Sequence, residues 1–183
     1  MMLSRLAAAI AGVITTLLLQ TTLIGPLTFP VPVSLPALLV IVVGIYAGPG
    51  IGVGLGFSMG LLADLGSDNP AGVQALCFLG AGLLAGVLGG LATQRGYGTR
   101  GVAAMAAGIG TLTCVAVGVL LAVLGSHAAS LSFTARSVVP VALTEALLGL
   151  LVVPLVRKML RAQGIRAPKP TTSVLARMPD VVR

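Results

Sequence analysis

Residues 35–65 read LPALLVIVVGIYAGPGIGVGLGFSMGLLADL, a run made almost entirely of apolar residues and glycine. As one helix, these 31 residues would be about 46 Å long, well beyond the roughly 30 Å hydrocarbon core of a bilayer. Gly48, Pro49 and Gly50 interrupt the run near its middle, where they break helical hydrogen bonding. The sequence therefore predicts two short helices that fold back at this turn, in preference to a single kinked span.

The composition places this hairpin in a membrane protein. Of 183 residues, 57% are hydrophobic and 8% are charged, and the mean hydropathy is +1.11. A soluble domain carries about 25% charged residues. Four further apolar runs, over residues 2–24, 71–92, 101–124 and about 136–156, are long enough to span a bilayer. The predicted fold is an all-α six-helix transmembrane bundle over residues 1–160, with short second and third helices.

The basic residues predict how this bundle is oriented. With six spans and a cytoplasmic N-terminus, ten of the eleven Lys and Arg residues are cytoplasmic, and only Arg136 lies outside. We therefore expect a multi-pass cell membrane protein with both termini in the cytoplasm. The net charge of +7 does not indicate nucleic-acid binding, because the cations lie at segment ends and aromatic residues make up only 3%.

Residues 161–183 form the basic, proline-containing end of the chain. They offer too little apolar surface to fold alone, so we expect a disordered cytoplasmic tail. Two interpretations of its charge stay open at this level. It adheres to anionic membrane lipid, or it is a solvated orientation signal.

Glycines recur at every fourth position in two of the predicted helices. Small residues at this spacing let membrane helices approach closely. The rows either pack within this chain or face a partner subunit, and self-association stays open. The candidate packing and partner residues are Gly52, Gly56, Phe57, Gly60, Asp64, Gly72, Gly82 and Gly86.

Two ionisable residues of the last span are candidate buried polar groups. Glu145 lies near the middle of the span, where a carboxylate costs about 2.5–3.5 kcal/mol, so we expect it to face the bundle interior. Arg136 begins the same span, at the level where Asp64 ends the first glycine row. The sequence therefore predicts an Asp64–Arg136 pair near the outer surface. Gln20, on the polar face of the first span, is interpreted as an interfacial residue in preference to one that lines a solute path.

A motif in the hairpin resembles the rod shape-determining protein MreD family. Pro36-Ala37-Leu38-Leu39 is followed by the G-F-x-x-G-L-x-x-D pattern of residues 56–64, and then by Gly72 and Leu76. The likeness covers roughly residues 15–95, and the size and six-span topology agree with it. Ala37 departs from the family pattern, which often has an acidic residue there.

The resemblance implies a non-enzymatic scaffold subunit of the bacterial wall-elongation (rod) complex, involved in cell shape and peptidoglycan synthesis. Its implied partners are an MreC-like bitopic membrane protein, an MreB-type filament, the RodA glycosyltransferase and a class B penicillin-binding protein. The implied fold is similar to that of the substrate-binding subunits of energy-coupling-factor vitamin transporters.

The residues themselves indicate no catalytic, cofactor or metal site. His127 has no acidic or thiol neighbour, Cys77 and Cys114 lie apart in apolar runs, and there is no phosphate-binding loop. The alternative function is that of a vitamin-capture subunit, for which Ala7 and Ala11 have the spacing of a transporter contact. A solute pocket needs placed polar and aromatic groups, and this chain has no Trp and two Tyr.

Overall fold

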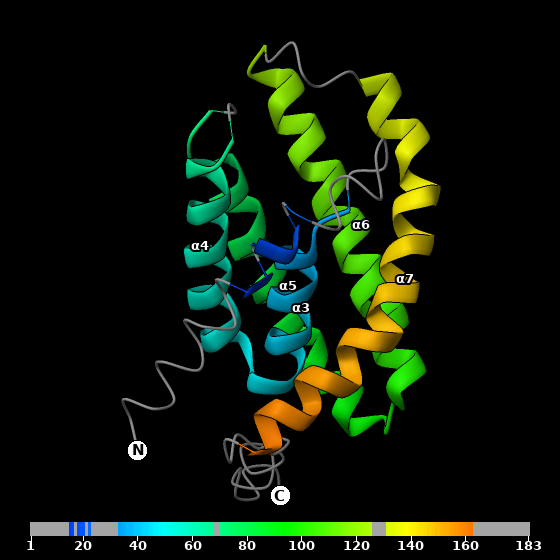
Figure 1. Ribbon diagram of the computed structural model, residues 1–183. Coiled ribbons are helices and arrows are strands. Elements are labelled where there is room, and N and C mark those ends of the chain that lie inside the picture. Colours follow the sequence, from blue (N-terminus) through cyan, green and yellow to red (C-terminus); the bar gives the residue numbers. More distant parts are fainter. Residues whose placement is uncertain are drawn as a thin grey trace, which may run out of the picture.

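The computed structural model describes residues 15–16, 18–20, 22, 33–67, 70–125 and 131–162. Five helices contain nearly all of this part of the chain, and it has no strands (Figure 1). They are α3 (Leu35–Ala47), α4 (Pro49–Leu65), α5 (Val73–Gln94), α6 (Thr99–Val123) and α7 (Leu131–Ala162). The predicted first span, residues 2–24, lies mostly outside the described residues, so the count of six helices stays a prediction.

The predicted hairpin turn is confirmed, because α3 ends at Ala47 and α4 begins at Pro49. Gly48 joins them with φ 92°, a backbone conformation that favours glycine. Pro49 takes the first position of α4, where a missing N–H costs nothing. At the other end of α3, the Ser34 hydroxyl accepts a hydrogen bond from the Ala37 N–H at 3.3 Å.

Within the described residues, three helices are long and apolar enough to cross a membrane: residues Val73–Ala92 of α5, Thr99–Val123 of α6 and Ala135–Leu160 of α7. The long apolar helices predicted for the last three spans are thereby confirmed. α7 has 32 residues, about 48 Å, and therefore exceeds the hydrocarbon thickness. It contains Pro140 and Pro154, and its last part turns beneath the C-terminal end of α3 (Figure 1).

The core is centred on α3, which contacts α4, α5, α6 and α7. α3 is apolar on all sides, as a helix surrounded by others must be. Its fully buried side chains pack against small or branched residues of α5, α6 and α7. The members of this cluster include Leu38, Ile41, Val42, Ile45, Ala81, Ala85, Val102, Ala106 and Val153.

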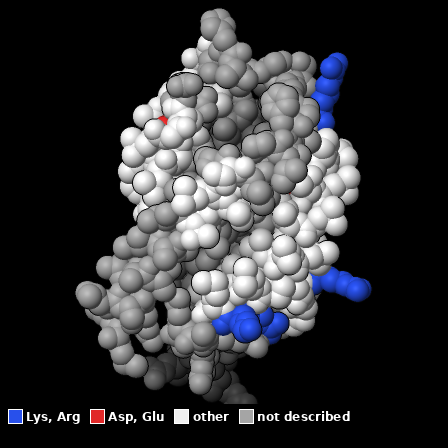
Figure 2. Space-filling view, in the orientation of Figure 1, with Lys and Arg blue, Asp and Glu red and all other residues white. Residues whose placement is uncertain are grey.

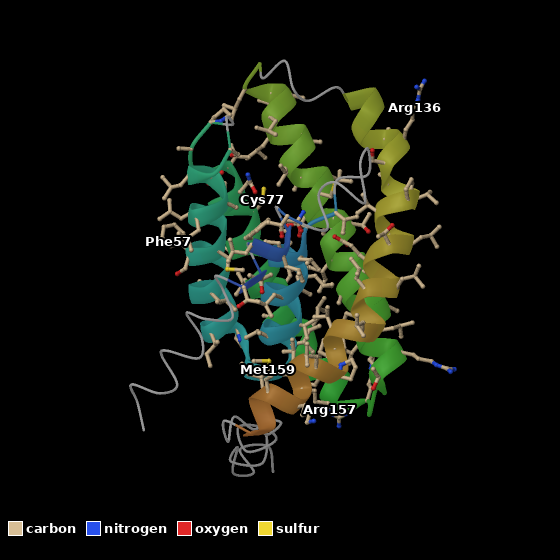
Figure 3. All side chains as sticks on the ribbon, in the orientation of Figure 1. Phe57, Cys77, Arg136, Arg157 and Met159 are labelled. Carbon is tan, nitrogen blue, oxygen red and sulfur yellow. The ribbon has the colours of Figure 1, made fainter. Side chains whose placement is uncertain are left out.

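The connections place the described cations mostly at one end of the bundle. The α3–α4 turn, the α5–α6 turn and the C-terminal end of α7 lie at the same end (Figure 1). Arg95 and Arg100 flank the second of these, and Arg157 and Lys158 lie on the third. A cation also projects from the opposite end (Figure 2), where Figure 3 places Arg136. The described part of the molecule is therefore polarised along its helix axes.

Candidate functional site: the hairpin of α4 and α5

The first glycine row of α4 lies directly against the backbone of α5. A Cβ atom added at Gly52 would overlap the backbone of Gly82, and one at Gly56 would overlap the Phe78 carbonyl. At Gly60 the obstacle is the backbone of Ala75. Backbone atoms cannot give way as a flexible side chain can, so this approach requires glycine. Of the two sequence interpretations, packing within the chain describes this row.

The second glycine row belongs to the same contact. Gly82 meets Gly52, while a Cβ at Gly86 would overlap Pro49 at the start of α4. Gly72 has a different role: its φ of 97° lies in the left-handed region, in the turn that leads into α5. The candidate glycines therefore build the α4–α5 contact and its turn.

Asp64 lies near the end of α4 that is opposite Gly48, beside the turn that leads into α5. Its carboxylate accepts hydrogen bonds from the backbone N–H groups of Gly72 (2.9 Å), Gln74 (3.0 Å) and Ala75 (3.0 Å). These donors belong to the start of α5, where helical N–H groups have no partner within the helix. The carboxylate also carries the charge that a helix N-terminus favours. Asp64 is only 4% exposed, so it is a buried cap for α5.

The predicted Asp64–Arg136 pair is wrong, and so is the prediction that Arg136 is buried. Three N–H groups already satisfy the Asp64 carboxylate. Arg136 is exposed, and its side chain points away from the bundle (Figure 3). The helix start that follows Asp64 presents its donors in fixed positions. The guanidinium, by contrast, would have to lose its hydration to be buried.

The outer face of α4 carries a second row of small residues. Gly50 and Gly54 would have open space around an added Cβ, and Ser58 is exposed. The Ser58 hydroxyl donates to the Gly54 carbonyl of its own helix at 2.9 Å. Phe57 is 49% exposed beside this row and points outward (Figure 3). Among the candidate interface residues on α4, Phe57 is therefore the one whose side chain is accessible from outside the bundle.

Glu145 faces the bundle interior, as predicted, and is 1% exposed. Its carboxyl group lies against Gly110 of α6, where an added Cβ would overlap the carboxyl oxygens. Within the described residues, its Oε2 atom has no hydrogen-bond partner. Sequence reasoning missed Gly110, because only the register between α6 and α7 shows which glycine receives the carboxyl group.

Gln20 holds the start of α3, a role that the sequence interpretation missed. Its Nε2 donates to the Val33 carbonyl, and its Oε1 accepts from the Leu35 N–H, both at 2.8 Å. An amide within an apolar run, followed by a proline-rich connection, was the available signal. Such a connection leaves backbone groups that need partners.

These features define the class of protein: a membrane protein, helical over the described residues, in which a glycine contact joins α4 to α5 and a buried aspartate caps α5. Residues 3–163 match the family model described as rod shape-determining protein MreD, and the chain belongs to this family. No curated protein and no solved structure matches it. The expected similarity to vitamin-transporter subunits therefore has no support from solved structures.

Within the described residues, no group of three or more His, Cys, Asp or Glu side chains could bind a metal ion. Cys77 lies on α5 and Cys114 on α6, and neither forms a disulfide within the described residues. The hairpin and the helix faces around it are therefore the features of this part of the chain from which a function can be argued.

Proposed function

We propose that this protein is a non-enzymatic membrane scaffold of the bacterial wall-elongation complex. It acts in cell shape and peptidoglycan synthesis by binding an MreC-type bitopic membrane protein. The observation that carries the proposal is the family match over residues 3–163, which includes the whole hairpin. The further assignment to the glycosyltransferase, the penicillin-binding protein and the MreB-type filament rests on the same match.

We further propose six spans with both termini in the cytoplasm. Four described cations lie at the bundle end that contains the α3–α4 turn: Arg95, Arg100, Arg157 and Lys158. Arg136 lies at the opposite end (Figure 3). Lys and Arg accumulate on the cytoplasmic side of membrane proteins. An additional span over residues 2–24 would start on the cytoplasmic side and end on the outer side of the membrane. α3 would then run from the outer side back toward the cytoplasm.

The outer face of α4 is the surface that we assign to the bitopic partner. Because the inner glycine row of α4 already contacts α5, the two helices form a packed pair, and the outer face of α4 is left toward the membrane. Gly54 leaves the backbone accessible to a neighbouring helix, while Phe57 offers a large apolar side chain beside it. A single transmembrane helix fits such a face.

The test is co-purification from membranes that contain an MreC-type partner. Gly54→Leu should reduce recovery of the partner about tenfold, while the protein itself reaches its normal level in the membrane. Gly108→Leu is the matched control, because Gly108 on α6 is also exposed with open space around its Cβ. Equal recovery with both variants would remove α4 as the surface. Recovery of a transporter ATPase pair with the unaltered protein would refute the scaffold function itself.

A further inference from the structure

The C-terminal end of α7 is held against the core. Pro154 lies inside the helix and cannot donate to the carbonyl four residues earlier. The last part of α7 turns beneath α3 (Figure 1). Beyond the turn, Val156 is buried, and Leu160 packs against the same α3-centred cluster. The side chains that point away from the core are therefore in defined positions.

An apolar row runs along the outward face of α7 and ends at two cations. Leu147, Leu151 and Leu155 are each more than half exposed and follow one another at four-residue spacing. Side chains at this spacing lie one above the other on a helix. Lys158 is three residues beyond Leu155 and continues the same face. Arg157 precedes it by one position, about 100° around the helix, and both cations are exposed.

The cations at this end have no acidic counterpart in the described part of the chain. Arg95 and Arg100 are exposed at the same end as Arg157 and Lys158. The described carboxylates lie elsewhere: Asp64 caps α5 at the opposite end, and Glu145 is buried midway along α7. This end therefore has a positive surface that complements an anionic partner.

We propose that the C-terminal end of α7 binds an anionic phospholipid of the cytoplasmic leaflet. The acyl chains lie along Leu147, Leu151 and Leu155, and the phosphate is held by Arg157 and Lys158. A phospholipid has this order of parts, a long apolar chain that leads into a negative headgroup. Basic residues at the cytoplasmic end of a membrane helix attract such headgroups.

A lipid fits this surface better than an acidic protein segment does. Leu147 lies eleven residues before Lys158, about 16 Å deeper along the helix and inside the hydrocarbon region. An acidic segment in the cytoplasm would reach the cations and leave the row uncovered. The lipid covers both with one molecule.

The experiment measures lipid retention by the purified full-length protein, with native mass spectrometry after exchange into phosphatidylglycerol or phosphatidylcholine. The unaltered protein should retain phosphatidylglycerol preferentially. The Arg157→Gln/Lys158→Gln double variant should lose about tenfold of that preference. Arg136→Gln is the matched control, because Arg136 is an exposed arginine at the other end of the same helix, and it should leave the preference unchanged. Raising the ionic strength should weaken the preference of the unaltered protein.

Several results would overturn the proposal. Equal retention of the two lipids by the unaltered protein is one, and an undiminished preference in the double variant is another. Loss of the preference in Arg166→Gln/Lys169→Gln alone would assign it to the tail instead. If the double variant keeps its lipid preference but loses an acidic protein in a separate co-purification from membranes, the cations are assigned to that protein. The melting temperature of each variant in phosphatidylcholine verifies that it is folded. The lipid measurement itself contains no partner protein, so its result is independent of the scaffold function.

Discussion

The replacement Asp64→Ala tests whether the motif aspartate is a structural cap. It removes the carboxylate that accepts three backbone N–H groups at the start of α5, and it leaves the rest of the hairpin in place. The matched control is Ser58→Ala. Ser58 lies on the same helix, but it is exposed and its hydroxyl bonds only to the carbonyl of Gly54 in its own turn.

The expected loss of stability follows from the geometry of the cap. A hydrogen bond to a charged group contributes about 1.5–3 kcal/mol, and loss of an N-cap side chain typically costs about 1 kcal/mol. The three bonds share one carboxylate, and water can replace part of them once the side chain is gone, so they do not add fully. We expect Asp64→Ala to lower the free energy of unfolding by about 3 kcal/mol. Asp64→Asn, which keeps an acceptor but loses the charge, should cost about half as much, and Ser58→Ala less than about 0.5 kcal/mol.

The assay is equilibrium unfolding of the purified protein in mixed micelles, supported by proteolysis at the turn between α4 and α5. Faster cleavage of this turn in Asp64→Ala than in Ser58→Ala would locate the effect at the cap. Equal and small effects of the two replacements would refute the reasoning. They would mean that solvent, and not Asp64, satisfies the start of α5.

Three further replacements test other contacts. Gly60→Ala places a Cβ into the backbone of α5 and should destabilise the contact between α4 and α5 by about 2 kcal/mol. Gly54→Ala, on the open face of the same helix, should be neutral within about 0.5 kcal/mol. Similar values for both variants would contradict the assigned faces. Gly110→Ala should displace the Glu145 carboxyl group. The Gly110→Ala/Glu145→Ala double variant should lose about 1 kcal/mol less stability than the two single variants lose together. Strict additivity in this double-mutant cycle would argue against the contact. Gln20→Leu loses two hydrogen bonds at the start of α3 and should lower the free energy of unfolding by about 2 kcal/mol in the same assay. An unchanged unfolding midpoint would show that the amide is dispensable.

The features that the sequence predicted correctly depend on local chemistry. Gly48 ends α3 because glycine readily adopts a positive φ. Pro49 begins α4 because the first position of a helix does not need an N–H donor. The length and composition of an apolar run indicate whether its helix can cross a bilayer, so the three long helices α5, α6 and α7 were predictable. Glu145 was correctly expected inside, because the cost of exposing a carboxylate to lipid depends on its depth in the membrane.

The tertiary structure determined which groups meet. Four-residue spacing marked a glycine row on α4, but only the packing of α5 distinguishes the buried row of Gly52 and Gly56 from the open row of Gly50 and Gly54. From the sequence, Arg136 was expected at the same membrane level as Asp64, and this opposite charge suggested the wrong partner for the carboxylate. Its carboxylate instead meets fixed N–H donors, because the turn brings the start of α5 to it. Sequence alone predicts helices and the depths of their side chains, whereas contacts between helices depend on a register that forms only when the backbones pack.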